Sequence, residues 1–405
     1  MSEHYASVPP SDSRGRRRRR WVLFLAALGV VSAGSVVAAA SGGASNPTAA
    51  RGFKLTKLAA MPAGVTNCND MTSLADGDYT QTRIPVGDLF VGCSNGVLTN
   101  GRGGPPNRKA DTSTMLEYTT AGKYVKQWSV ANQIAGTAGE PLHRRILMPL
   151  DSAANSELVF VDPNIVGSFA EIQYAYSPNP QSASAAKSLH TGGGTQSVVV
   201  DSHDDIFVTA SHPTRLGATG SFKVVLTPPN GPPPAKGTAA LSPTFSDDAT
   251  ATNGNTGKGR VKLALHEINS NAIVPSSSRK YAGDYVITDQ ATRQLVFSSN
   301  ITAGKGLTAL KTTLGLNDIR WATSKHGTFY LVRRGAQTPL ARSSLYKVTG
   351  PFVKGAAYAT TGDELVRVNL SNGKLTPIVR GLGASVGLVY VNPGGTVTQL
   401  PVNGA

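Results

Sequence analysis

The chain of 405 residues is 40% hydrophobic and only 16% charged, and it contains 44 glycines and 25 prolines. This composition is typical of a globular, turn-rich protein with few long helices. The formal net charge is +15, but aromatic residues make up only 6% of the chain and no basic stretch alternates with them, which argues against a nucleic-acid-binding protein.

Residues 1–40 follow a different pattern from the rest. Arg14 and the arginines at 16–20 precede an uncharged stretch, 21–40 (WVLFLAALGVVSAGSVVAAA), that ends in three alanines. This order predicts a secretory signal peptide. The alternative is a retained signal anchor, because twenty helical residues span about 30 Å, the thickness of a bilayer core. Either segment would place the following residues outside the cytoplasm, as a secreted or cell-envelope protein, and the arginines also permit a twin-arginine route.

Charge suggests a partner for the exported body. Residues 1–20 carry +4, residues 21–40 carry no charge, and the remainder of the chain therefore keeps +11. A basic exported body is expected to bind an anionic envelope polymer, a glycan or a protein. The alternative is a surface that only maintains solubility. Contact with a membrane is expected only through an uncleaved N-terminal segment.

The two cysteines, Cys68 and Cys93, form an even pair in a chain predicted to enter an oxidising compartment. One disulfide is the simplest prediction, and it would contribute about 3 kcal/mol to stability. A metal site at these cysteines would need further Cys or His residues at close spacing, and the sequence has none there.

After an expected flexible linker at 41–52, short strand-like runs separated by turn residues fill the chain. In chain order, the expected strands or hairpins are 53–61, 87–93, 115–130, 146–162, 170–177, 197–212, 222–227, 283–297, 318–332, 344–349, 356–370, 374–380 and 387–392. The segment 101–108 (GRGGPPNR) is expected to be a loop, and residues 228–259 a low-complexity, mobile insertion.

One hairpin pattern recurs, most clearly in 197–212 (SVVVDSHDDIFVTASH), with chain reversals near residues 87, 156, 204, 292, 327 and 362. The intervals between them range from 35 to 88 residues, around the period typical of propeller blades. We therefore predict an all-β fold, a six- or seven-bladed β-propeller over residues 53–405.

A ring of blades must close, because open strand edges invite aggregation. The strand-like run at 53–61 precedes the first recognisable hairpin, and the run at 387–392 has too little chain after it to build a blade. We predict that these two runs belong to the same blade.

The strings VVVDSHDDIFVT, VITDQATRQLVF and TSKHGTFYLV resemble the NHL-type repeat, in which an apolar strand, an Asp and a turn lead into a second apolar strand. The resemblance implies a propeller that serves either as a binding platform or as a lactonase or lyase. The Glu-Gly-Pro string of gluconolactonase-like propellers does not occur; the nearest string is Gly139-Glu140-Pro141. Asp204 stands where the repeat usually has Gly.

Propeller ligands usually lie where blade-connecting loops meet over the central channel. Glu140, Asp201, Asp289 and Asp318 are therefore candidate ligands for a divalent metal such as calcium, although the fold requires no cofactor. The alternative is that these carboxylates fix turns and strand ends.

His203 and His326 occupy the same place in their repeats and form a candidate polar site, unless they only bond their own loops. Residues 383–387 (GASVG) match a nucleophile elbow, but a strand follows Ser385 and no acid or His comes after it.

The sequence thus predicts an exported propeller that binds a polymer, glycan or protein outside the cytoplasm. The alternative is a metal-dependent hydrolase or lactonase of the gluconolactonase-like type. We expect a channel mouth lined by Ser, Thr and aliphatic residues in a binding module, and three or more inward carboxylates in an enzyme. No catalytic residue is assigned.

Overall fold

The computed structural model describes residues 46–74, 84–85, 88–96, 112–140, 143, 145–151, 156–163, 171–180, 194–213, 217–231, 235–335, 342–393 and 396–397. The chain divides after residue 43, and all of these residues belong to the unit of residues 44–405. The expected signal segment 1–40 and the expected loop 101–108 lie outside the described residues. No helix able to cross a membrane occurs in the described part of the chain.

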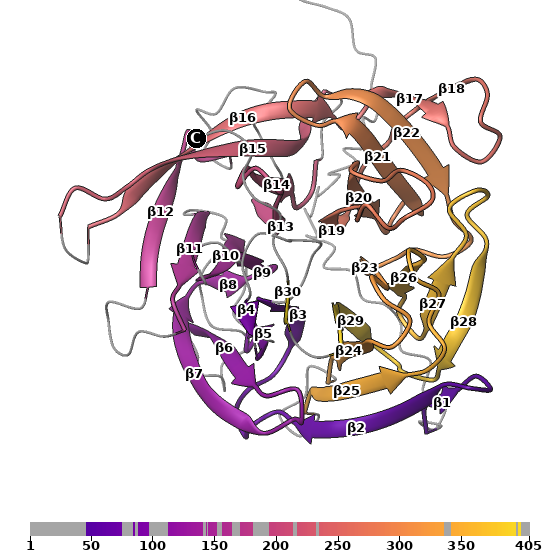
Figure 1. The fold of residues 1–405 in the computed structure, drawn as a ribbon. Helices are drawn as coiled ribbons and strands as arrows, with labels where there is room; N and C mark the ends of the chain where they lie inside the picture. Colours follow the sequence, from indigo (N-terminus) through magenta and orange to yellow (C-terminus); the bar gives the residue numbers. More distant parts are fainter. Residues whose placement is uncertain are drawn as a thin grey trace, which may run out of the picture. The chain divides into compact units, whose positions relative to one another are not determined.

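The described strands form five larger sheets around one axis (Figure 1), and we number their antiparallel groups of strands, in chain order, as blades 1 to 6. Blade 1 is antiparallel and has the strand order β3-β5-β6-β7. Its strands are β3 (Cys68–Ser73), β5 (Leu89–Cys93), β6 (Thr112–Tyr118) and β7 (Tyr124–Ala131). A separate two-stranded sheet pairs β4 (Ile84–Pro85) with β30 (Thr396–Val397).

Blades 2 and 3 are the two antiparallel halves of a nine-stranded sheet. Blade 2 contains β8 (Gln133–Ile134), β9 (Ala138–Glu140), β10 (Arg145–Asp151), β11 (Glu157–Val161) and β12 (Glu171–Ser177). Blade 3 contains β13 (Thr195–Val200), β14 (Ile206–Ala210), β15 (Thr219–Thr227) and β16 (Gly237–Ser246). Their outer strands, β12 and β16, pair in parallel, so each outer edge covers the other.

Blade 4 has the order β19-β20-β21-β22 with two further strands on its outer edge. The main strands are β19 (Ile268–Ile273), β20 (Tyr285–Asp289), β21 (Gln294–Asn300) and β22 (Lys305–Lys311). The outer pair is β17 (Thr250–Asn253) and β18 (Arg260–Lys262). The expectation of a mobile insertion at 228–259 is therefore wrong, because this stretch supplies β16 to blade 3 and β17 to blade 4. Alternating burial of β16 side chains explains how so polar a sequence forms a strand.

Blades 5 and 6 are assembled from interleaved segments. Blade 5 has the order β23-β26-β27-β28-β1, from β23 (Asp318–Trp321), β26 (Ala357–Thr360), β27 (Leu365–Val368), β28 (Leu375–Arg380) and β1 (Thr48–Ala49). Blade 6 has the order β29-β24-β25-β2, from β29 (Ser385–Val391), β24 (Thr328–Arg333), β25 (Ser344–Thr349) and β2 (Lys54–Ala60).

This interleaving overturns one predicted hairpin. The stretch 318–332 was expected to fold back on itself, but β23 pairs with β26 in blade 5, whereas β24 pairs with β25 and β29 in blade 6. Two strands joined by a short polar segment look like a hairpin in sequence, and only the pairing partners distinguish a hairpin from a crossing between blades. The reversals near 292 and 362 are turns within blades 4 and 5, whereas the one near 327 is this connection between blades 5 and 6. An extra reversal between two true turns explains the short spacing.

The predicted closure is confirmed. The run at 53–61 forms β2 and the run at 387–392 falls largely in β29, and both strands belong to blade 6. The strand β1 extends the closure to blade 5, where Thr48 and Ala49 pair with Arg380 and Val379. The last part of the expected linker 41–52 thus belongs to the propeller.

A hydrophobic cluster lies at each contact between neighbouring blades. Residues from blades 6 and 1 form one cluster, and the other five join blades 1 and 2, 2 and 3, 3 and 4, 4 and 5, and 5 and 6. The inner strands β3, β9, β13, β19, β23 and β29 contact one another in this order around the axis. The predicted all-β propeller class is thereby confirmed.

The predicted disulfide is also confirmed: Cys68 and Cys93 are bonded, and they face each other across β3 and β5. Both side chains are fully buried in the cluster between blades 6 and 1. The bond therefore joins the two inner strands of blade 1 close to the seam where the ring closes.

We predict that deletion of residues 387–405 destabilises the whole ring and does not merely fray one end. The deletion removes most of β29, which pairs with β24 and places Leu388, Val389 and Tyr390 in the clusters on both sides of blade 6. Loss of these side chains should lower the free energy of unfolding by about 5 kcal/mol or more. Denaturant unfolding measures the effect. Deletion of residues 398–405 alone is the control, and equal midpoints for the two deletions would contradict the prediction.

Candidate functional site

The inner strands of neighbouring blades approach so closely that some positions require glycine. A Cβ atom on Gly139 of β9 would lie 2.6 Å from the carbonyl oxygen of Ser73, and one on Gly387 of β29 would lie 2.4 Å from the amide nitrogen of Met71. Both partners belong to β3 of blade 1. The absence of a side chain at these two positions therefore lets three blades meet along the axis.

Two carboxylates, the half-buried Asp70 and the buried Asp318, connect inner strands of neighbouring blades. Asp70 of β3 accepts a hydrogen bond of 2.7 Å from the backbone N–H of Thr137, which comes directly before β9. Asp318 of β23 accepts hydrogen bonds from the Ser270 hydroxyl of β19 at 2.6 Å and from the Leu388 N–H of β29 at 2.7 Å. The two carboxylates thus hold together inner strands of five blades.

The guanidinium of Arg320 partly neutralises this network. Its Nη1 donates to Asp318 at 2.8 Å and to the backbone carbonyl of Asn271 at 3.4 Å. Burial raises the pKa of Asp70 to about 7, and the neighbouring Asp318 carboxylate adds to the rise. Burial also raises the pKa of Asp318, while Arg320 opposes the change.

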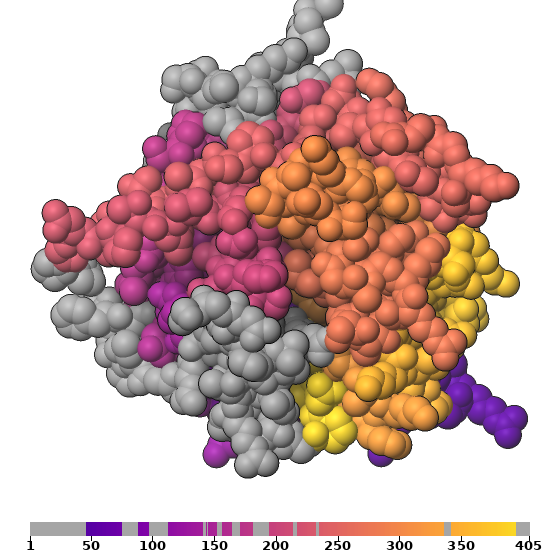
Figure 2. Space-filling view, turned by 45° about the horizontal axis from the view of Figure 1, so that its top comes forward, coloured from indigo at the N-terminus to yellow at the C-terminus, as the bar shows by residue number. Residues whose placement is uncertain are grey.

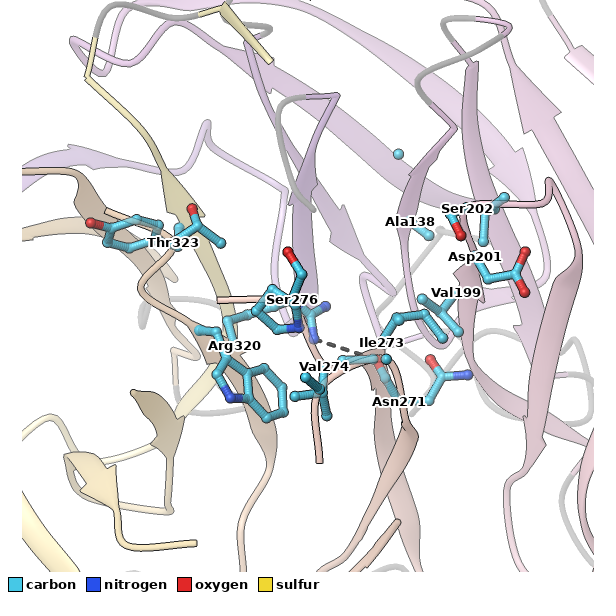
Figure 3. Close-up of a pocket in the computed structure, with 18 of the residues that line it drawn as sticks. Ala138, Val199, Asp201, Ser202, Asn271, Ile273, Val274, Ser276, Arg320 and Thr323 are labelled. Carbon is cyan, nitrogen blue, oxygen red and sulfur yellow. Dashed lines mark hydrogen bonds between the residues drawn. The ribbon is translucent and has the colours of Figure 1, made fainter. Parts of the chain in front are cut away.

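A cavity of about 400 Å³ opens where β13, β19 and β23 end. In Figure 3 the labelled residues of these strands and of the segments that follow them surround one space, and the dashed line marks the bond from Arg320 to Asn271. Its apolar lining includes Ala138, Val198, Val199, Val200, Ala272, Ile273, Val274, Pro275, Trp321 and Tyr390. Its polar lining includes Asp201, Ser202, Asn271, Ser276, Arg320 and Thr323. We call this space the mouth cavity.

Asp201 is the one carboxylate among the described lining residues of the mouth cavity, and its Oδ1 already has two donors. The N–H groups of His203 and Asp205 donate to it at 2.8 and 2.9 Å. The His203 side chain is 81% exposed, with its Nδ1 3.6 Å from Asp201 Oδ2. The pair thus lies in the turn between β13 and β14.

Asp289, His326 and Ser385 are not among the residues that line this cavity. Asp289 ends β20, where it accepts hydrogen bonds from the N–H groups of His266 at 2.6 Å and Thr292 at 3.1 Å. His326 is exposed in the segment between β23 and β24. Ser385 is fully buried and donates to the carbonyl of Thr361 at 2.6 Å, so its hydroxyl is not accessible as a nucleophile.

Among the described residues, one group of possible metal ligands lies within 4.8 Å, and it contains Glu140, His143 and Asp204. The structure thus does not gather Glu140, Asp201, Asp289 and Asp318 into one site. The Nδ1 of His143 lies 3.1 Å from Glu140 Oε1 and 3.8 Å from Asp204 Oδ2. Arg145, however, binds both Glu140 oxygens, at 2.6 and 3.0 Å. A metal would have to displace this bidentate pair.

Asp204 itself adopts a φ of +62° in the turn after β13. This left-handed backbone conformation suits Gly best, but Asp tolerates it better than most residues do. Burial raises the pKa of Asp204, and the Glu140 carboxylate adds to the rise.

A second polar cluster, at the end of β10, was not predicted from the sequence. Asp151 is buried and accepts a hydrogen bond from the Ser211 hydroxyl at 3.3 Å, and Ser211 also contacts Nδ1 of His212 at 2.9 Å. The order of contacts differs from that of a catalytic triad, in which His lies between the acid and Ser. Ser211 is 1% exposed, so a substrate would not reach it. Burial raises the pKa of Asp151 to about 8.

No family model and no curated protein sequence matches this chain. Solved structures similar to it include a streptogramin B lyase, with 10% identity over 81% of this chain and 74% of that chain at a TM-score of 0.40. A chain of a nidogen/laminin complex has 7% identity over 82% and 86%, at 0.41. A proposed gluconolactonase has 12% identity over 85% and 96%, at 0.38. Because identity and TM-scores are this low, the fold assignment rests on the strand pairings described above.

We predict that Asp151→Asn reduces the pH dependence of stability. The folded state retains the Asp151 proton up to about pH 8, whereas the unfolded chain releases it near pH 4. The folded state therefore binds more protons between these values, and its stability falls as pH rises. In the variant, the decrease in unfolding free energy from about pH 5 to about pH 8 should be smaller by more than about 1 kcal/mol.

Denaturant unfolding at several pH values checks this prediction. Asp248→Asn is the matched control, because a hydrogen bond from the Ser246 hydroxyl lowers the pKa of Asp248. Asp248 is ionised throughout the pH range tested, so its variant should keep the wild-type slope. A wild-type slope in Asp151→Asn would contradict the prediction.

Proposed function

We propose that the propeller is a binding module that holds its ligand in the mouth cavity. The observation that carries this proposal is the lining, which is mainly aliphatic and contains Asp201 as its one carboxylate among the described residues. The described lining residues thus offer one carboxylate and not the pair that acid and base roles would use, and the Oδ1 of that carboxylate already accepts two turn N–H groups. A cavity of about 400 Å³ suits a small molecule or a side chain inserted from a partner.

The proposal includes export of the propeller. The arginine-rich start, the apolar stretch 21–40 and the small residues before Ser41 support a secretory signal or anchor ahead of the propeller. The buried Cys68–Cys93 disulfide is consistent with an oxidising compartment. We retain the NHL-type resemblance as part of the proposal, because Asp201 directly follows β13, Asp289 ends β20, and both accept turn N–H groups.

A metal-dependent hydrolase is the second candidate, favoured by the group of Glu140, His143 and Asp204. The group follows the lining residues Gly139 and Ser202 closely in sequence, so a metal there would lie near the mouth cavity. The three side chains offer oxygen and nitrogen donors of the kind that divalent ions use. The ion pair between Glu140 and Arg145 is the reason this candidate ranks second.

Blocking the mouth cavity tests the binding proposal. We predict that the neutral, apolar dye N-phenyl-1-naphthylamine binds the protein saturably, and that Ser276→Trp weakens its affinity about tenfold or more by filling the cavity. Ser276 is exposed at the cavity, so the larger side chain should not disturb the core. Dye fluorescence measures the affinity. Ser129→Trp, at an exposed position of β7 in blade 1, is the matched control and should bind the dye normally.

Two outcomes would overturn the proposal. One is the absence of saturable dye binding, and the other is an equal effect of both tryptophan variants.

We further predict that the dialysed protein binds neither Ca²⁺ nor Zn²⁺ stoichiometrically in calorimetry, because Arg145 occupies both oxygens of Glu140. Stoichiometric binding that is lost in His143→Ala would favour the hydrolase instead.

A further inference from the structure

A second concave surface lies on the outside of the ring, between blades 4 and 5. It is a cleft of about 760 Å³ formed by the β17–β18 hairpin, the end of β22 and the turn between β27 and β28. Figure 2 shows the projecting β17–β18 hairpin next to the strands β21 and β22 and the yellow part of blade 5. We call this surface the outer cleft.

Hydrogen bonds fix the walls of the outer cleft relative to one another. The side-chain amide of Asn255 donates to the carbonyls of Lys311 and Asn372, each at 2.9 Å, and its oxygen accepts the N–H of Lys311 at 2.8 Å. A Cβ atom on Gly373 would lie 1.9 Å from the Lys311 carbonyl, so only glycine permits this contact. The cleft is therefore preformed, with one asparagine joining three chain segments.

The outer cleft has a strongly positive lining. Lys262, Lys311 and Lys374 line it, and all three are exposed. No carboxylate occurs among its described lining residues. Asp248 approaches Lys262 at 3.6 Å, but the lysine side chain is 73% exposed, so solvent weakens this pair. Arg293 adds positive charge at the border, where its Nη1 donates to the carbonyl of Thr313.

The remaining lining residues are suited to an anionic ligand with a polar backbone. Asn253, Asn255, Gln294, Asn372, Thr312 and Thr313 offer amides and hydroxyls between the lysines. No aromatic side chain occurs among the described lining residues, so the cleft lacks the stacking surfaces that single-stranded nucleic acids use. Three separate ammonium groups in one cleft of about 760 Å³ favour repeated anionic groups over one small anion.

We propose that the outer cleft binds a linear polymer that carries regularly spaced anionic groups, either phosphodiesters or uronates, on a backbone without aromatic bases. The three lysines pair with successive anionic groups, and the amides and hydroxyls bind the polar backbone between them. This site is separate from the mouth cavity, so the propeller can be attached to a polymer while the cavity stays open. The two proposals are tested independently: a negative result for dye binding in the mouth cavity would not affect the proposal for the outer cleft, and the reverse also holds.

The test uses the full chain and two charge-matched triple variants. One replaces Lys262, Lys311 and Lys374 by Gln. The control replaces Lys54, Lys57 and Lys123, three exposed lysines of β2 and the β6–β7 turn, by Gln. Both variants lose the same net charge and keep the N-terminal arginines, so nonspecific attraction changes equally in both. Thermal unfolding followed by circular dichroism verifies that both remain folded.

The probes are poly(glycerol phosphate), polygalacturonate and a single-stranded oligonucleotide, with neutral dextran as the blank. We expect the outer-cleft variant to bind poly(glycerol phosphate) or polygalacturonate about tenfold more weakly than the wild type, and the control variant to lose at most about twofold. The dependence of affinity on salt should also become shallower, because fewer counterions are released. The polymer that binds the wild type more tightly identifies the preferred anionic group, phosphodiester or uronate.

Three results would overturn the proposal. Equal weakening in both triple variants would show attraction by net charge alone. Unchanged binding in the outer-cleft variant would place the polymer elsewhere. Tighter binding of the oligonucleotide than of both other polymers, lost in the outer-cleft variant, would replace the proposed ligand class by nucleic acid.

Discussion

The whole structure depends on the pairing of strands from opposite ends of the chain. Blade 6 takes its inner strand, β29, from the C-terminal part and its outer strand, β2, from the N-terminal part. Without β29 and β2, the pair of strands β24 and β25 would expose its two outer hydrogen-bonding edges. The two hydrophobic clusters beside blade 6 would also each lose one side. Each blade packs against two neighbours, so a ring left open at blade 6 would leave blades 1 and 5 each with one uncovered face.

The candidate sites follow from that closure. The inner strands can meet at the axis only because glycines occur at the tightest contacts, and the space that remains is occupied by carboxylates with hydrogen-bond donors from neighbouring blades. The mouth cavity lies where these strands diverge toward their carboxyl ends. The outer cleft, in contrast, exists because blade 4 carries two extra strands whose turn reaches blade 5 through Asn255. The mouth cavity is thus formed by the ring of blades itself, and the outer cleft by the β17–β18 hairpin added to the edge of blade 4.

Strand positions and the closing pair could be predicted from the sequence, because alternating or continuous apolar runs between turn residues are local signals. The disulfide followed from an even cysteine pair. The interleaving of blades 5 and 6 could not be predicted in this way, since β23 and β24 are separated by the same kind of polar segment that joins the strands of a true hairpin. The strand β16 was missed because only Leu241 and Phe245 among its residues are large and apolar, and small or polar residues and Pro243 surround them.

The candidate sites were less predictable than the fold. Asp201 was predicted as a candidate metal ligand, and the turn in which it lies depends on N–H groups that no spacing reveals. Asp70 and Arg320 gave no signal, because no recognisable motif surrounds a charged residue within either short strand. Their importance arises from strands far apart in sequence that meet at the axis. The three lysines of the outer cleft are likewise scattered over more than one hundred positions, and only the contact between the hairpin and blade 5 brings them together.

The interleaved order of strands has a consequence for how such a chain can change over evolution. In blades 1 to 4 nearly all strands of a blade are contiguous in sequence, so duplication or loss of one segment would add or remove a whole repeat. Blades 5 and 6 do not permit this, because the chain leaves blade 5 after β23, builds the middle of blade 6, returns for β26 to β28 and only then supplies β29. Any cut that removes one of these blades also removes part of the other. The two blades are therefore inherited as a single indivisible module, and changes in blade number are confined to the other side of the ring.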